Sequence, residues 1–244
     1  MTVILAIDAL EYDLVERFDC AHLHQRYYGK TDIREFSEPR TMVLWTSFMT
    51  GMNMERQVLA LGDKEMWNLS LDIGKTLFKK FDNPSIIDLP GFSYDLEQHA
   101  QERNLLKQYF DTSNSGEKER IRNAYNHLAF EHHRKIKAAF RKALEEDHDF
   151  VLGYFSVADV IGHLNFDNTI LMRMVYRDLD EIAATVKKDM IVLSDHGMVK
   201  LGIFGDHSDY GFWSTRDRDL GTPKITDFYN ILLGKRESRP YRQE

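Results

Sequence analysis

Acidic residues and histidines stand close together at several places in this chain of 244 residues, where they could bind divalent metal ions. Asp195 is followed directly by His196 and Gly197, just after an apolar run. Asp159 and His163 are four residues apart, a spacing that places both on one face of a helix. Each pair also has a plain alternative, because a hydrogen bond between aspartate and histidine inside a core would explain it as well.

Two more side chains could join such a metal site. Asp8 directly follows the apolar run 3–7, a position where a carboxylate can also cap the next helix. His207 lies in the glycine-bracketed segment 205–211, whose composition predicts a surface loop.

Thr41 offers a hydroxyl group near the start of a helix predicted over Pro39–Gly51, with Gly51 as its stop. The free N–H groups at a helix N-terminus favour an oxyanion or a phosphate. Threonine is also a good helix cap, which is the alternative role for Thr41. Its neighbour Arg40 could contact a phosphate oxygen or face solvent.

Strands and helices alternate in a way that would bring these residues together. Short apolar runs with the character of strands buried on both faces cover Val3–Ile7, Ser85–Leu89, Phe150–Phe155 and Met190–Leu193. Between the strands, helical spacing predicts one or two helices over Glu117–Glu146 and one helix over Asn168–Lys187, with Asn168 as N-cap. This pattern predicts an α/β fold, a three-layer α/β/α sandwich with a mostly parallel central sheet. Ligands gather beyond the carboxyl ends of such strands, so Asp8 and Asp195 should meet there.

Composition limits the classes of function that fit. With 43% hydrophobic residues and no repeat or linker, residues 1–244 are predicted to form one domain. The net charge of −7 argues against a large nucleic-acid partner and a polybasic membrane anchor, and it fits small, discrete substrates. Cys20 is the only cysteine, which excludes an intrachain disulfide and a thiolate zinc site. The chain shows neither a signal-peptide pattern nor an apolar stretch of ~20 residues, so we expect a cytoplasmic protein.

Taken in order, these fragments resemble the type I phosphodiesterase/nucleotide pyrophosphatase branch of the alkaline phosphatase superfamily. The matching segments are the Asp8 strand end, Thr41 to Gly51, Asp159 to His163, Ser194 to Met198, and His207 before Tyr210 to Ser214. The ordered set spans nearly the whole chain and is far more specific than any one piece. The resemblance implies an alkaline phosphatase-like fold and a two-metal phosphoester hydrolase with Thr41 as its catalytic nucleophile.

The resemblance also implies ligands for two divalent metal ions. The first metal would be held by Asp8, Thr41, Asp195 and His196, and the second by Asp159, His163 and His207. Zinc is the usual metal of the family and suits mixed aspartate and histidine ligation, and manganese is an alternative. Two dipositive ions would balance three carboxylates and one alkoxide, so a small phosphoester or nucleotide-like substrate would meet little net repulsion.

The implied reaction is attack of Thr41 on phosphorus, departure of an alcohol or nucleotide, and hydrolysis of the phosphothreonine. The chain departs from the family at one place. The nucleotide pyrophosphatases carry a Pro-Asn-His run shortly after the nucleophile, whose Asn helps to hold a phosphate oxygen, whereas this chain has Val43, Leu44 and Trp45 there. That oxygen must therefore be held in another way or by metal alone. Two small segments, Tyr210–Trp213 and Asp88–Phe92, are predicted to contact the substrate.

Other functions remain open alongside the phosphodiesterase. The same metal pair can take a monoester, so a phosphomonoesterase is the alternative within the superfamily. A sulfatase is disfavoured because Thr41 cannot be converted to formylglycine, and a phosphoglycerate mutase because its nucleophile is serine and its inserted domain would not fit this length. A non-catalytic binding protein with the same fold is a third alternative. Against it, all seven positions hold a residue able to coordinate a metal.

Two other pairs of histidines lie outside these motifs. His22 and His24 are predicted to lie on the surface. His132 and His133 point to different sides of a predicted helix, so they cannot share an ion on it. None of the four is assigned to the site.

Overall fold

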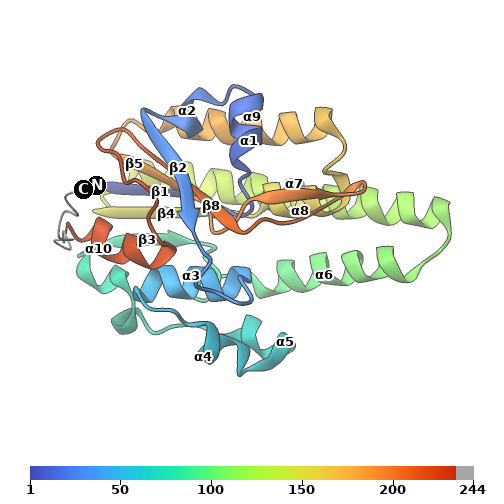
Figure 1. The fold of residues 1–244 in the computed structure, drawn as a ribbon, viewed down its shortest axis with the longest axis horizontal. Coiled ribbons are helices and arrows are strands. Elements are labelled where there is room, and N and C mark those ends of the chain that lie inside the picture. The colour runs from blue at the N-terminus through green and yellow to red at the C-terminus, as the bar shows by residue number, and fades with distance from the viewer. Residues whose placement is uncertain (235–244) are drawn as a thin grey trace, which may run out of the picture.

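The computed structural model describes residues 1–234 and shows a central sheet covered by helices on both faces (Figure 1). The strands are β1 (Thr2–Ile7), β2 (Tyr27–Asp32), β3 (Pro84–Ile87), β4 (Phe150–Phe155), β5 (Met190–Leu193), β6 (Met198–Leu201), β7 (Phe204–His207) and β8 (Tyr210–Thr215). The helices are α1 (Tyr12–Arg17), α2 (Ala21–His24), α3 (Thr41–Thr50), α4 (Glu55–Leu59), α5 (Gly62–Glu65), α6 (Leu96–Asp111), α7 (Ser115–Glu145), α8 (Val157–Asn165), α9 (Thr169–Thr185) and α10 (Phe228–Leu232). Short 3₁₀ helices are η1 (Met66–Asn68), η2 (Ile73–Lys75), η3 (Leu77–Lys80) and η4 (Ile225–Asp227).

The central sheet has six strands in the order β2-β8-β5-β1-β4-β3. Strand β1 pairs in parallel with β4 and β5, and β3 pairs in parallel with β4. Strand β8 runs antiparallel to both β5 and β2. The predicted three-layer α/β/α fold with a mostly parallel sheet is confirmed. Strands β6 and β7 form a separate antiparallel hairpin.

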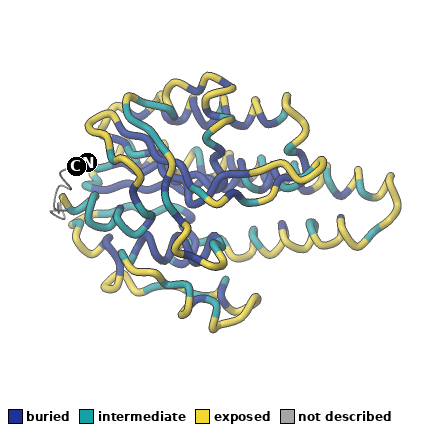
Figure 2. Tube along the Cα trace, in the orientation of Figure 1, coloured by how far each residue is buried: buried dark blue, intermediate teal, exposed yellow. Residues whose placement is uncertain are grey.

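The sheet divides the apolar core into two parts, because successive side chains of a strand point to opposite faces. In β1, Val3, Leu5 and Ile7 pack in one cluster with residues of α7, α8 and α9. Ile4 and Ala6 pack in the other cluster with residues of α3 and η3. Figure 2 shows the buried trace concentrated along the sheet, while exposed residues follow the outer sides of the helices. Within residues 1–234, no helix combines the length and the apolar character needed to span a bilayer.

Most predicted elements are confirmed, and two of the four predicted strands, β4 and β5, have the predicted ends. The Asn168 side chain caps α9 by accepting a hydrogen bond from Leu171 N at 3.1 Å. Helix α7 is one continuous helix of 31 residues. Gly51 ends α3 with a left-handed φ of 69°. Strand β3 ends before the predicted Leu89, because Asp88 has a left-handed φ of 60°.

The surface loop predicted over 205–211 is wrong, because most of this segment is extended. Strand β7 continues to His207, and β8 begins at Tyr210. The glycines that suggested a turn are needed for close backbone approach instead. At Gly211, a Cβ atom would lie 2.3 Å from the carbonyl oxygen of Ser194.

Candidate active site

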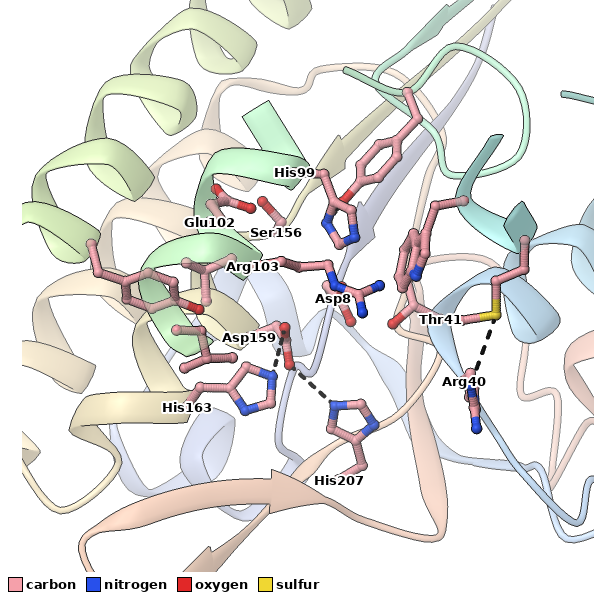
Figure 3. A pocket seen from close by; sticks show the side chains of 16 residues that line it. Asp8, Arg40, Thr41, His99, Glu102, Arg103, Ser156, Asp159, His163 and His207 are labelled. Carbon is pink, nitrogen blue, oxygen red and sulfur yellow. Dashed lines mark hydrogen bonds and ion pairs between the residues drawn. The ribbon is translucent and has the colours of Figure 1, made fainter. Parts of the chain in front are cut away.

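The carboxyl ends of three parallel strands meet at one edge of the sheet, as predicted. Asp8 follows β1, Ser156 follows β4, and Asp195 lies two residues beyond β5. Asp8 and Asp195 are buried, at 3% and 0% exposure. A cavity of about 290 Å³ lies at this edge, and Figure 3 shows the side chains that line it.

Helix α8 and strand β7 bring three more predicted ligands to this cavity. The carboxylate of Asp159 lies between two imidazoles: its Oδ2 is 3.2 Å from His163 Nε2, and its Oδ1 is 3.5 Å from His207 Nε2 (Figure 3). The helical spacing predicted for Asp159 and His163 is confirmed, since both lie on α8.

His196 joins the buried carboxylates. Its Nε2 lies 3.2 Å from Asp8 Oδ1 and 3.5 Å from Asp195 Oδ2. The ring of His207 stacks on that of His196, with centroids 3.8 Å apart and an interplanar angle of 19°. The two predicted metal sites are therefore neighbours rather than separate places.

Within residues 1–234, two sets of three side chains are close enough to hold metal ions, with ligand atoms within 4.8 Å of one another. They are Asp159 with His163 and His207, and Asp8 with Asp159 and His196. Asp159 belongs to both sets. It therefore links the two groups of ligands, which the motif spacing alone does not reveal.

Several buried polar atoms of this cluster make no hydrogen bond within the described part of the chain. They are Asp8 Oδ1, Asp159 Oδ1, Asp195 Oδ1, Asp195 Oδ2 and His196 Nε2. Buried carboxylates whose oxygens accept no hydrogen bond are costly unless positive charge, from the neighbouring imidazoles or from a metal ion, compensates them. Carboxylate oxygens and imidazole nitrogens are also the donors that zinc and manganese accept. The residues present thus fit divalent cations.

Protonation equilibria in the cluster show how strongly its charges interact. Burial alone would lower the pKa of His196, but Asp195 and Asp8 outweigh it and raise that pKa to about 10. Burial also opposes the charged form of His163, yet Asp159 raises its pKa to about 9. For Asp195, burial raises the pKa well above its usual range, and the charge of Asp8 adds to this. The cluster therefore favours positive charge among its carboxylates.

Contacts outside the ligand set hold the ligands in place. The hydroxyl of Tyr154 donates a hydrogen bond to Asp8 Oδ2. Ser194 Oγ accepts from Leu10 N at 2.9 Å and donates to the carbonyl oxygen of His196 at 2.6 Å, which ties the ends of β1 and β5 together. Such supporting contacts orient metal ligands. Motif reasoning assigned no role to Tyr154, and the only signal for Ser194 is its position next to the ligands.

Gly197 is required by close packing against Glu11. A Cβ atom at this position would lie 2.3 Å from Glu11 Oε2 and 2.7 Å from Ser208 Oγ. The same Glu11 Oε2 accepts a hydrogen bond from Met198 N at 2.8 Å. The glycine after His196 therefore lets a buried carboxylate anchor the segment that follows the ligands.

Thr41 is the first residue of α3, so it lies near a helix start as predicted, and it lines the cavity. It is 8% exposed, and the helix start next to it leaves N–H groups without intrahelical partners. Its neighbour Arg40 pairs with Glu38 at 2.7 Å and with Asp63. Two carboxylates thus already bind the Arg40 guanidinium.

Comparison with known proteins shows which fold this is. Neither a sequence profile of a protein family nor a curated sequence matches the chain. Among solved structures, a mutant TAB5 alkaline phosphatase with bound magnesium matches over 96% of both chains, with a TM-score of 0.52 and 12% identity. The chain has the alkaline phosphatase fold.

Two other structures of this kind are also similar. Murine ectonucleotide pyrophosphatase/phosphodiesterase 5 matches with a TM-score of 0.46 and 13% identity over 82% of this chain. The match spans 58% of the murine protein, so this chain covers little more than half of its length. A sulfatase from Pseudoalteromonas sp. matches with a TM-score of 0.49 and 14% identity, over 98% of this chain and 68% of that chain.

In this alkaline phosphatase fold, helix α6 and nearby segments form a cavity wall that the sequence did not predict. It contains Trp67, Tyr94, His99, Glu102 and Arg103. A signal was available, because His99 and Arg103 are four residues apart and share a helix face. Neither predicted recognition segment is among the residues that line the cavity.

The predicted recognition segments have structural roles instead. In Tyr210–Trp213, which is part of β8, Phe212 and Trp213 are fully buried in the core. In the other segment, the Asp88 carboxylate accepts a hydrogen bond from the His132 ring. The expectation that these two segments contact substrate is therefore not supported by the cavity.

Proposed function

We propose that the chain is a metal-dependent phosphoester hydrolase that binds two divalent cations and uses Thr41 as its nucleophile. The observation that carries this proposal is the position of Asp159, which lies in both candidate ligand sets beside a cavity that Thr41 also lines. The buried carboxylate oxygens that accept no hydrogen bond give a further reason to expect cations there.

The residues divide between the two cations as the motif order suggests. In this assignment Asp8, Thr41, Asp195 and His196 hold one ion, and Asp159, His163 and His207 hold the other. Zinc suits these donors best, and manganese is the second choice. When bound, such ions stabilise the alkoxide form of a hydroxyl and neutralise charge on a phosphoryl group.

The part played by the chain itself is nucleophilic attack in two steps. Thr41 Oγ1 gives its proton to solvent and forms a bond to phosphorus as the bond to the leaving oxygen breaks, and the leaving oxygen takes up a proton from solvent. Water then gives a proton to solvent and forms a bond to phosphorus as the Thr41–phosphorus bond breaks, and Thr41 Oγ1 takes up a proton, which restores the hydroxyl. The N–H groups at the start of α3 stabilise negative charge beside the reacting centre. Asp8 and His196 are fixed by Tyr154 and Ser194, so the site is preorganised.

Within this class we propose a phosphodiesterase or nucleotide pyrophosphatase acting on a small phosphoester or nucleotide-like substrate, because the ordered motifs resemble that branch. A phosphomonoesterase is the second candidate. It is favoured by Leu44, which is fully buried and cannot donate to a phosphate oxygen, and by the cationic Arg103 in the cavity wall.

Metal analysis of the purified protein, combined with hydrolysis of two model esters, tests the proposal. We expect two zinc or manganese ions per chain and turnover of bis-p-nitrophenyl phosphate. Faster turnover of p-nitrophenyl phosphate would support the phosphomonoesterase. Failure to hydrolyse either ester with either metal supplied would contradict the hydrolase and favour a binding protein with the same fold.

A further inference from the structure

His99 is a histidine of the cavity wall that belongs to neither set of metal ligands. Its Nδ1 lies 3.1 Å from Tyr94 Oη, and its ring packs on Trp67 with centroids 3.9 Å apart. Its Nε2 is buried and makes no hydrogen bond with any of residues 1–234. Figure 3 shows the ring beside the cavity. The imidazole is thus fixed at one nitrogen and on one face, and its other nitrogen lacks a partner.

The contact with Tyr94 bears on which nitrogen of His99 carries the proton, because either the phenol or the ring Nδ1 can donate in it. Burial raises the pKa of Tyr94 well above its ordinary value, so the phenol keeps its proton and can donate it to Nδ1. Burial, assisted by Arg103, lowers the pKa of His99 to about 4, so its ring is neutral near pH 7. A neutral imidazole that accepts at Nδ1 carries its proton on Nε2. In that tautomer, His99 offers an N–H donor at Nε2 that has no partner among residues 1–234.

Arg103 adds a cation to the same wall. It lies one helical turn after His99 on α6, and its guanidinium carbon is 5.5 Å from the centroid of the Trp67 ring. Arg40 has its guanidinium taken by two carboxylates, whereas Arg103 makes no close ion pair among the described side chains. Among residues 1–234, neither His99 Nε2 nor the Arg103 guanidinium has a close acceptor, while Glu102 Oε1 of the same wall accepts from Gln98 at 2.8 Å. Two donor groups without an acceptor favour an anion.

Leu44 stands where the nucleotide pyrophosphatases, which the chain resembles, carry an Asn that helps to hold a phosphate oxygen. Leu44 is fully buried in the core, so it can offer no group to a phosphate oxygen. We propose that His99 Nε2–H and the Arg103 guanidinium together bind the non-bridging oxygens of the phosphoryl group that Thr41 attacks. This pair, the His99–Arg103 clamp, rests on the proposed function and makes His99 a substrate-contacting residue.

Binding of inorganic phosphate to the zinc-loaded protein tests the clamp without requiring turnover. We expect His99→Ala to weaken phosphate binding about 10- to 100-fold, the usual loss for a hydrogen bond to a charged group, with unchanged zinc content. His127→Ala is the matched control, because His127 is an exposed histidine of α7 that pairs with Glu131 at 3.5 Å. Wild-type phosphate affinity in a fully zinc-loaded His99→Ala protein would overturn the clamp.

Conservative variants separate a direct contact from a structural role. His99→Gln places an amide N–H close to the position of Nε2, so we expect it to retain most of the phosphate affinity. His99→Asn places its N–H near Nδ1 and should bind as weakly as His99→Ala. Equal losses in the Gln and Asn variants would contradict a donor at Nε2.

The tautomer can be observed directly by ¹⁵N NMR of the His99 ring. We expect the proton on Nε2 in the wild type and a mixture of tautomers in Tyr94→Phe, accompanied by weaker phosphate binding. A wild-type ring protonated at Nδ1 would contradict the assigned geometry.

The clamp and the hydrolase fail in different ways. If the protein hydrolyses no ester but binds phosphate in a way that depends on His99, the clamp is supported and the proposed hydrolase activity is contradicted. If His99→Ala hydrolyses esters with wild-type KM and kcat and binds phosphate with wild-type affinity, the hydrolase activity is supported and the clamp is contradicted.

Discussion

Two regions of this molecule pair aspartate with histidine, and they do so in different ways. On α7, His132 contacts Asp88 and His133 contacts Asp178, each at 2.6 Å. In the candidate site, the N–O separations between aspartates and histidines are 3.2 to 3.5 Å. Each of these α7 histidines bonds to a single aspartate, while the site cluster brings several carboxylates and imidazoles together at longer separations.

The carboxylates show the difference most clearly. Asp88 also accepts from Asp95 N at 2.9 Å, and Asp178 also pairs with Lys137, so both oxygens of each are used. In the site cluster, neither oxygen of the fully buried Asp195 has a hydrogen-bond partner among residues 1–234. Aspartates whose two oxygens are both bonded therefore hold elements together, and aspartates whose oxygens accept no hydrogen bond are free to bind cations.

The largest expected effect of a change in the site cluster is loss of turnover in Thr41→Ala. Removal of a nucleophile typically costs at least about 10³-fold in kcat, while the carboxylate and imidazole ligands stay in place. We therefore expect ester hydrolysis to vanish and metal content to remain largely intact. Retained hydrolysis would remove Thr41 from its role.

Replacing one aspartate in each region separates them by metal content. Asp159→Asn removes a charge from both candidate ligand sets, so we expect the purified protein to lose bound zinc. Asp178→Asn, in an α7 pair, should keep the wild-type zinc content. Equal metal content in the two variants, measured by plasma mass spectrometry, would contradict the distinction between the regions.

A smaller effect is expected from Tyr154→Phe, which leaves every ligand in place. This change removes only the hydroxyl that donates to Asp8. Loss of such a supporting hydrogen bond commonly lowers metal affinity or activity about 10- to 100-fold. A competition titration with a zinc chelator measures the change in affinity. Unchanged affinity and turnover would show that Tyr154 does not orient Asp8.

The smallest effect concerns stability at an α7 pair. The hydrogen bond from His133, assisted by Lys137, lowers the pKa of Asp178 to about 2. A depressed carboxyl pKa stabilises the folded state above the unfolded pKa of about 4, and this contribution is lost as pH falls toward 2. The side chain is 36% exposed, so we expect only about 1 kcal/mol between wild type and Asp178→Asn at pH 7. Urea unfolding at several pH values tests this, and a difference that stays constant down to pH 2 would contradict it.

How far the sequence predicts this structure depends on how local each signal is. The apolar runs at Phe150–Phe155 and Met190–Leu193 predict β4 and β5 with the observed ends. A strand buried on both faces is apolar along its whole length, so the run itself marks the strand. The ordered motifs likewise predict the meeting of Asp8 with Asp195, since both follow parallel strands of one sheet. The segment 205–211 was misread because its glycines serve close packing, a tertiary requirement that looks like a turn signal.

The substrate side of the site was less predictable. Whether α6 turns His99 and Arg103 toward the cavity depends on how that helix packs, although their spacing places them on one face. Similarly, Asp159 could be assigned to one metal from its motif, but its closeness to both groups depends on how α8 lies against β1 and β5. The spacing of residues within one segment can be read from the sequence, whereas the distances between segments depend on tertiary packing.

Anomalous diffraction at the zinc absorption edge, from crystals of the zinc-loaded protein, tests the central claim most directly. We expect two zinc peaks close to Asp159, one beside His163 and His207 and the other beside Asp8 and His196. Zinc bound elsewhere, or no zinc at these side chains, would contradict the two-metal site.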